Sequence, residues 1–209
     1  MLDLPASTIV NRFVPKEKFY TKTNINTKLR QQFTEEVDKI RWTHKLSPQT
    51  LNITSDDYLE LQVFEISLKG NIISQSVLRH IDTFIPHPIL FIIKKQGAEK
   101  AVLAFKQSAT KSDVQMKVEQ LYETPWTTAL DLHLQGRSVE EIYRNYLYQI
   151  APQLQSDTYL DTKTAIDNDS RRQKIVKQIA TLNKSIASEI SIAKKQEMAR
   201  ERYRLEQTL

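Results

Sequence analysis

The sequence contains no cysteine among its 209 residues. That absence excludes disulfide bonds, cysteine nucleophiles and cysteine-ligated metal sites, and an intracellular protein requires none of them. No apolar run approaches the roughly 20 residues that a membrane-spanning helix needs. The acidic Asp3, with no apolar segment behind it, argues against a secretory signal peptide. We therefore expect a cytoplasmic protein that does not enter a membrane.

Recognisable catalytic and metal-binding patterns are also missing. The four histidines, His44, His80, His87 and His133, are scattered along the chain. His87 lies between two prolines, and no second ligand is spaced to form a metal site with it. We predict no metal and no cofactor, and we expect a protein without catalytic activity.

The composition indicates a soluble folded protein, with 40% hydrophobic and 26% charged residues and a mean hydropathy of −0.48. The length suits one domain of ordinary size with an extension. The net charge of +5 is unevenly distributed. Between Arg171 and Arg204 there are ten basic and three acidic residues, so the rest of the chain is close to neutral.

The fold is centred on residues 81–106. Ile89–Ile93 is a continuous apolar run between Pro88 and the Gln96-Gly97 turn, which predicts a strand buried on both faces. A second strand is expected over 61–68 and a helix over 74–85. Strand, helix and strand form a crossover unit, which favours parallel pairing. The short connection at Gly97 predicts an antiparallel hairpin with residues 100–105.

The flanking segments complete an α/β (α+β) fold, a small mixed sheet of about four strands with flanking helices. Leu29, Phe33, Val37 and Ile40 recur at helical spacing, predicting a helix of about fifteen to eighteen residues that begins near Asn26. We expect residues 1–24 to form an ordered arm rather than a strand. A strand is expected over 114–122, and Ser138 with Glu141 predicts a capping box before a helix that ends near residue 150.

Three regions follow from these elements: a core domain over 1–152, a polar linker over 153–170 and one long basic helix over 171–209. That last region contains no glycine or proline. Its apolar stripe predicts a surface for a partner, or for a second copy of the chain. The stripe residues are Ile175, Ile179, Leu182, Ile186 and Ile190. The basic residues that we expect to face nucleic acid or an acidic partner are Arg171, Arg172, Lys174, Lys194, Lys195, Arg200, Arg202 and Arg204.

Asp57, Glu65 and Lys69 are the weak candidates for catalysis. They invite comparison with metal-dependent nucleases, in which carboxylates hold a divalent ion and a lysine orients water. The spacing differs from that pattern, because the residue two after Glu65 is Ser67 and the lysine follows four residues on. An ion pair at an exposed strand end is the alternative interpretation.

Five segments of the chain together carry a family resemblance: NRFVPKEKFY, VFEISLK, IPHPILFIIKK, LYETPW and KIVKQIATLNKSIASEISIAKKQEMARERYRLE. They resemble the bacterial family called domain of unknown function 4391, and the resemblance covers nearly the whole chain. It implies a gene neighbourhood with a helicase and a DNA methyltransferase, in restriction-modification or phage-defence clusters. The implied function is a non-catalytic adaptor that binds one of these partners through its C-terminal helix. The alternative is a metal-dependent nuclease or a direct DNA-binding subunit. The resemblance transfers no catalytic residue.

Overall fold

A computed structural model describes residues 2–21, 25–55, 58–108, 116–155 and 162–209. The chain forms two compact units, 1–153 and 154–209. No helix among the described residues is long and apolar enough to cross a membrane.

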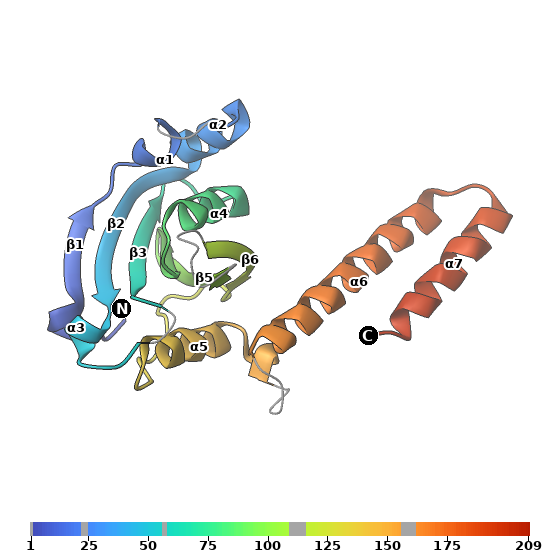
Figure 1. The fold of residues 1–209 in the computed structure, drawn as a ribbon. Helices are drawn as coiled ribbons and strands as arrows, with labels where there is room; N and C mark the ends of the chain where they lie inside the picture. The colour runs from blue at the N-terminus through green and yellow to red at the C-terminus, as the bar shows by residue number, and fades with distance from the viewer. Residues whose placement is uncertain (1, 22–24, 56–57, 109–115, 156–161) are drawn as a thin grey trace. The chain divides into compact units, whose positions relative to one another are not determined.

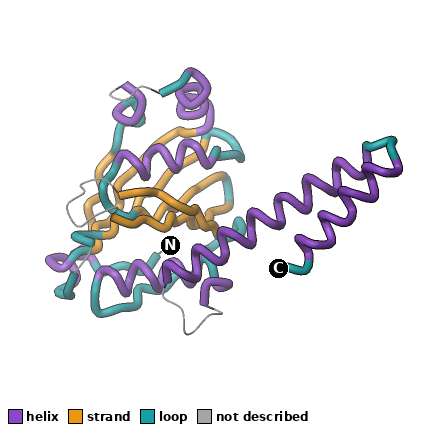
Figure 2. Tube along the Cα trace, turned by 45° about the vertical axis from the view of Figure 1, so that its right-hand side comes forward, coloured by secondary structure: helices purple, strands orange, loops and turns teal. Residues whose placement is uncertain are grey.

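The first unit is built on one mixed sheet of six strands, in the order β1-β2-β3-β4-β5-β6 (Figure 1). Its strands form one continuous curved layer (Figure 2). The helices of this unit include α1 (Lys18–Thr21), α2 (Thr27–Glu36), α3 (Pro48–Leu51), α4 (Gln75–Phe84) and α5 (Val139–Ile150). The strands are β1 (Ile9–Phe13), β2 (Val37–Leu46), β3 (Leu61–Leu68), β4 (Ile89–Lys95), β5 (Ala98–Ser108) and β6 (Met116–Glu123).

The predicted centre of the sheet is confirmed. Strands β3 and β4 pair in parallel through the α4 crossover, and β4 and β5 form the expected antiparallel hairpin around Gly97. Every residue of Ile89–Ile93 is buried. Gly97 has a φ of 70°, a left-handed conformation that glycine adopts without strain.

Alternation along the strands separates two faces of the sheet. One face, with Phe64, Phe91 and Val102, packs against Phe33 of α2 and Leu78 of α4 in a single apolar core. Residues of the opposite parity point away from this core, because successive side chains of a strand point to opposite faces. That second face includes residues such as Val63, Leu90, Ile92 and Leu103.

The predicted helix of fifteen to eighteen residues is wrong, because α2 ends at Glu36 and Val37 begins β2. Val37 and Ile40 are buried on the strand instead. Their three-residue spacing fits a helix, but β2 gains backbone hydrogen bonds to both β1 and β3. The N-terminal arm, which was predicted to contain no strand, contributes β1 at Ile9–Phe13. Together β1 and β2 raise the number of strands in the sheet from about four to six.

Both predicted helix caps are present, with one change. The Asn26 side chain accepts a hydrogen bond from the Leu29 backbone N–H at 2.8 Å, and the Ser138 hydroxyl accepts one from the Glu141 N–H. The Glu141 carboxylate does not complete the predicted box, since it accepts the Arg137 N–H instead.

Replacing Asn26 with alanine removes the acceptor that satisfies the first turn of α2. We expect Asn26→Ala to lower the free energy of unfolding by about 1 kcal/mol, the usual value of such a cap. Urea unfolding followed by circular dichroism measures this loss. Asn26→Asp keeps an acceptor and should retain most of the stability; an equal loss in both variants would contradict the capping role.

A buried ion pair joins β5 to α4. Lys106 and Asp82 are both fully buried, with Lys106 Nζ 2.9 Å from Asp82 Oδ1. Lys106 Nζ also donates hydrogen bonds to the Ile85 and His87 backbone oxygens at 2.8 and 2.6 Å. One ammonium group therefore holds both the C-terminal end of α4 and the turn that leads into β4.

Burial raises the pKa of the Asp82 carboxyl from 3.8 to about 6, against the opposing attraction of Lys106. The folded protein therefore binds this proton more tightly than the unfolded chain. The stabilisation is complete below pH 3.8 and is lost as the pH rises through about 6. We expect the stability of the wild type relative to Asp82→Asn to fall by up to about 3 kcal/mol across that window. Urea unfolding at several pH values measures it, and a constant difference would contradict the raised pKa.

The second unit contains two helices, α6 (Thr162–Ser188) and α7 (Ile192–Glu206), which pack against each other. The prediction of a single helix over 171–209 is therefore wrong. The predicted linker over 153–170 is also too long, because α6 begins at Thr162. At the break, Glu189 Oε1 accepts the backbone N–H groups of Ile190 and Ser191 at 2.9 and 3.0 Å. These bonds lower the pKa of the Glu189 carboxyl.

The break lets the two helices cover each other's apolar stripes. Ile175, Ile179, Leu182 and Ile186 are half-buried on α6, as are Met198 and Leu205 on α7. Arg202 of α7 donates a hydrogen bond to Asn183 Oδ1 of α6 at 3.1 Å. A continuous helix would leave this stripe in water, so folding back is favoured by apolar burial.

Candidate functional site: a polar pocket on the second face of the sheet

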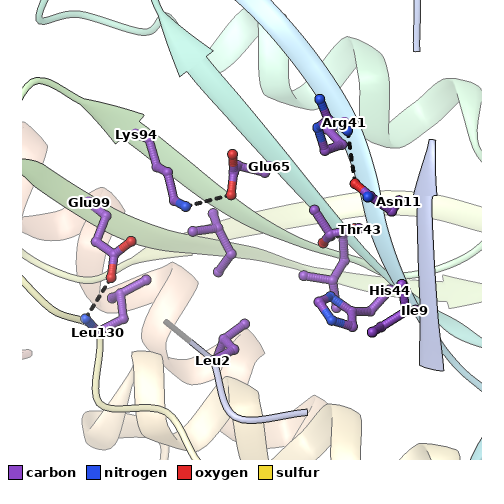
Figure 3. A pocket seen from close by; sticks show the side chains of 12 residues that line it. Leu2, Ile9, Asn11, Arg41, Thr43, His44, Glu65, Lys94, Glu99 and Leu130 are labelled. Atoms are coloured by element: carbon purple, nitrogen blue, oxygen red, sulfur yellow. Dashed lines mark hydrogen bonds and ion pairs between the residues drawn. The ribbon is translucent and has the colours of Figure 1, made fainter. Parts of the chain in front are cut away.

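A pocket of about 290 Å³ opens on the second face of the sheet. Figure 3 shows Lys94 and Glu65 on one side of it, Arg41 and Asn11 on another and Leu2 opposite. Charged and apolar side chains share its wall. The full lining is Leu2, Ile9, Asn11, Arg41, Thr43, His44, Val63, Glu65, Ile92, Lys94, Glu99 and Leu130.

The charged residues form a row across four neighbouring strands. In the strand pairing Arg41 of β2 lies opposite Glu65 of β3, and Lys94 of β4 lies opposite Glu99 of β5. An ion pair joins β3 to β4 within this row, with Lys94 Nζ 2.5 Å from Glu65 Oε2. Positive and negative groups therefore alternate across the sheet, each beside a group of the opposite charge.

Two irregularities in strand pairing shape the pocket's rim. The register of β1 and β2 shifts between Ile9 and Arg12, where Asn11 has a φ of 49°. The register of β2 and β3 shifts between Trp42 and His44, so the successive residues Thr43 and His44 both line the pocket. Such bulges bend a strand and redirect side chains, and they are over-represented beside functional sites.

Fixed hydrogen bonds orient several of these polar groups. Arg41 Nη1 donates a hydrogen bond to Asn11 Oδ1 at 2.8 Å, which joins β2 to β1 (Figure 3). Glu99 Oε1 accepts the Leu130 N–H at 2.9 Å, and this bond fixes the loop that closes one side. These two bonds therefore connect four separate segments of the pocket wall: β1, β2, β5 and the loop at Leu130.

His44, another residue of the pocket wall, has a ring nitrogen without a hydrogen-bond partner among the described residues. This atom, Nδ1, is buried. Burial lowers the pKa of the imidazole, so His44 is neutral at pH 7. A neutral imidazole can either donate or accept through Nδ1, according to its tautomer.

The charged groups of the row lie beside groups of the opposite charge. Glu65 is neutralised by Lys94, and its partner on β2 is the cation Arg41. Within the described part of the chain, no group of three histidine or carboxylate residues is placed to hold a metal ion. Hydrolysis with a divalent ion needs several oxygen ligands around that ion.

The three weak nuclease candidates are not brought together among the described residues. Glu65 lies in the pocket, whereas Lys69 follows the end of β3, about 13 Å along the chain at extended spacing. Asp57 lies outside the described residues. The lysine that Glu65 contacts is Lys94. No local pattern pairs these two residues, because their contact depends on β3 and β4 being neighbours.

The predicted partner-binding residues lie in the second unit. Four of the five stripe residues are half-buried along α6, and Ile190 lies at the turn with 92% of its surface exposed. Lys195 and Arg202 are half-buried on α7, and Glu206 lies 3.3 Å from Arg202. The predicted basic residues that are exposed are Arg171, Arg172, Lys174, Lys194, Arg200 and Arg204.

Sequence reasoning missed most of the pocket. The predicted helix from Asn26 includes Arg41 and ends just before His44, and the predicted arm includes Asn11, so the prediction places none of the three on a sheet. Glu65 is one of the candidates named from the sequence, and alternation could also have found Lys94 and Glu99, which are polar residues near the ends of apolar strands. Their common face follows only from the strand order.

Comparison with known proteins places the whole chain in one family. No curated protein matches the sequence, and no solved structure matches it. A family model for a domain of unknown function, DUF4391, matches residues 2–209, and the chain therefore belongs to the DUF4391 family.

Proposed function

We propose that the chain is a non-catalytic accessory subunit of a bacterial antiviral DNA-defence system of the restriction-modification type. The α6/α7 hairpin binds a helicase or DNA methyltransferase partner. The observation that carries this proposal is the apolar surface that the hairpin leaves in water. Ile190 and Ile192 at its turn are 92% and 74% exposed, and Tyr203 and Val176 are 61% and 49% exposed.

Exposed apolar side chains gathered at the turn favour a protein partner. Isolated surface leucines and isoleucines are ordinary, but Ile190 and Ile192 lie two residues apart at one tip. Exposed basic residues flank this tip, with Lys184 before it and Lys194 after it. A partner that offers an apolar groove rimmed by carboxylates complements both features.

The gene neighbourhood implied by the family resemblance supplies the identity of the partner.

Direct DNA contact is the second candidate, and the exposed basic residues of α6 and α7 favour it. Phosphate contacts would make such binding strongly salt-dependent, since counterions are released. Apolar anchoring at Ile190 and Ile192 depends far less on salt. The two candidates therefore differ in which residues matter and in how salt acts.

Co-purification with the products of the neighbouring genes tests the proposal. We expect the full chain to retain a helicase or methyltransferase, and Ile190→Asp/Ile192→Asp to reduce the retained amount at least about tenfold, the factor for a loss of 1.4 kcal/mol. Ile72→Asp is the matched control, because Ile72 is 73% exposed in the first unit. It should retain the partner fully.

Two outcomes would overturn the proposal. The first is full retention by the Ile190→Asp/Ile192→Asp variant. The second is loss of retention in the wild type after nuclease treatment, which would show that DNA bridges the two proteins. A variant with glutamine in place of Arg171, Arg172 and Lys174 tests whether DNA bridges the two proteins. If it does, this variant should bind less DNA and retain less of the partner.

A further inference from the structure

We propose that one side of the α6/α7 hairpin binds an amphipathic α-helix of a partner protein, and that acidic residues border the apolar face of that helix. The inference rests on the proposed role of the hairpin in partner binding, and it adds a second contact surface to the turn. Three features support it: the one-sided distribution of apolar residues, the basic residues that border them and the closed backbone of both helices.

The two helices of the hairpin pack through rows of half-buried residues. Figures 1 and 2 show α6 and α7 side by side and running in opposite directions. The row on α6 is Ile175, Ile179, Leu182 and Ile186, and the row on α7 includes Lys195, Met198 and Arg202. The residue after each member points about 100° away from the row, since an α-helix completes a turn in about 3.6 residues. Because the helices are antiparallel, this rotation directs both sets of following residues to the same side of the hairpin.

That side is largely apolar on both helices. Val176 and Tyr203 are 49% and 61% exposed, and Ile192, which continues the α7 set toward the turn, is 74% exposed. The apolar side consists of Val176, Ala180 and Ala187 on α6 and Ile192, Ala199 and Tyr203 on α7. Asn183 and Gln196 are its polar members, and Asn183 accepts a hydrogen bond within the hairpin.

The opposite side of the hairpin is polar on both helices. It consists of the residues that precede the members of the two rows: Lys174, Gln178, Thr181 and Ser185 on α6, and Lys194, Glu197 and Glu201 on α7. All of these are exposed. Water solvates such groups well, whereas the apolar side leaves Val176, Ile192 and Tyr203 in water. The hairpin therefore gains apolar burial when a partner covers one side and not the other.

The closed backbone of the hairpin favours a helix as the occupant. Helix backbone groups are bonded within each helix, so an extended peptide cannot pair with them as it pairs with a sheet edge. A helix instead packs its side chains between two antiparallel helices, as in a helix bundle. Val176 lies 14 residues before Ile190 and Tyr203 lies 13 after it, so both are roughly 20 Å from the turn. The apolar side is therefore long enough for roughly four turns of a bound helix.

Basic residues border the apolar side and select the charge of the occupant. Residues three or four positions apart are neighbours on a helix surface. By this spacing, the exposed cations Arg172, Lys184 and Arg200 each adjoin a member of the apolar side. Within α6 and α7 the acidic residue at this spacing is Glu206, which lies 3.3 Å from Arg202. Acidic borders on the bound helix complement this arrangement, whereas a second copy of the chain would bring like charges together.

Fluorescence anisotropy of labelled synthetic peptides, titrated with the full chain, tests the inference. The probe is an amphipathic helix of about 20 residues, with leucine on one face and glutamate along both borders of that face. The comparison peptide has lysine in place of each glutamate. We expect saturable binding of the glutamate peptide and at least about tenfold weaker binding of the lysine peptide, because the borders of the apolar side are basic.

Three variants identify the surface that binds the peptide. Val176→Asp/Tyr203→Asp should weaken binding of the glutamate peptide at least about tenfold, because it places two carboxylates on the apolar side. Thr181→Asp/Ser185→Asp is the matched control, since it adds the same charge to the exposed polar side, and it should bind as the wild type does. Lys184→Glu/Arg200→Glu should reverse the preference and favour the lysine peptide, a result that a loss of folding cannot produce.

Co-purification separates this inference from the proposed function. Selective binding of the glutamate peptide by a wild type that retains no helicase or methyltransferase would refute the partner's identity and support the helix-binding side. Full retention of the partner by Val176→Asp/Tyr203→Asp, or equal binding of the two peptides, would overturn the inference. So would a dimer in light scattering that the same variant dissociates, or binding of duplex DNA by a chain that binds neither peptide.

Discussion

Replacing Lys106 with methionine lowers the free energy of unfolding by about 3–5 kcal/mol, because it leaves a buried carboxylate without its counter-ion. Methionine keeps most of the side chain's volume, so the loss reports on the charge rather than on a cavity. Lys106 is fully buried, and its ammonium contacts Asp82 Oδ1 and two backbone oxygens.

The surroundings of Lys106 explain why this one position matters. Its backbone N–H donates to the Tyr143 hydroxyl at 2.8 Å, and its carbonyl accepts from the Tyr58 hydroxyl at 2.8 Å. Burial lowers the pKa of the Lys106 amine, which Asp82 partly opposes. The residue thus connects β5 to α4, to α5 and to the segment before β3.

Lys100→Met is the matched control on the same strand. Lys100 is 8% exposed, but its partner Glu123, 2.7 Å away, keeps 45% of its side chain in water. A solvated carboxylate left alone costs little, so we expect a loss of about 1 kcal/mol or less. Urea unfolding at pH 7 compares the two variants. A similar loss in both would contradict the role of the buried pair, and Asp82→Leu added to Lys106→Met should recover part of the stability.

Phe33→Ala should cost about 3–5 kcal/mol, the usual cost of removing a fully buried aromatic ring. Phe33 is 0% exposed and is the only buried residue of α2. Its ring lies 6.2 Å from Phe19, 5.7 Å from Tyr20 and 5.8 Å from His80, measured between ring centroids. One side chain therefore joins α1, α2 and α4.

Phe84→Ala is the control for this prediction. Phe84 also contacts Phe19, with ring centroids 5.5 Å apart, but it is 44% exposed. Its removal leaves less of a cavity, because water can fill the space. We expect a loss smaller than that of Phe33→Ala by at least about 1 kcal/mol. Equal losses would show that α2 is not anchored through Phe33.

Local patterns located the centre of the fold correctly. The apolar run Ile89–Ile93, the helix before it and the glycine turn after it were each assigned to the right element and pairing. The signals there are short-range. The run is apolar at every position, a proline precedes it, and a glycine turn follows it. The spacing of Phe33, Val37 and Ile40 fits a helix, although the last two residues lie on a strand. The same reasoning therefore predicted a helix that continues past the end of α2 into β2.

The candidate pocket could not have been predicted as a unit. Glu65 was singled out for its charge, but its partner Lys94 is 29 residues away and becomes a neighbour only because β3 and β4 pair in parallel. Asn11 and His44 reach the pocket through irregular strand pairing, which leaves no periodic signal in the sequence. Both limits have one cause, because strand order and register are long-range properties.

By itself, the sequence determined the α/β class, the crossover unit, the buried central strand and the basic character of the C-terminal region. Those properties depend on periodicity and composition, which act over a few neighbouring residues. Only the tertiary structure decided that Val37 begins a strand, that the C-terminal region folds into a hairpin at Glu189, and that Arg41, Glu65 and Lys94 form one row. In each case the outcome depends on apolar burial and backbone pairing between segments far apart in the chain, which no local pattern specifies.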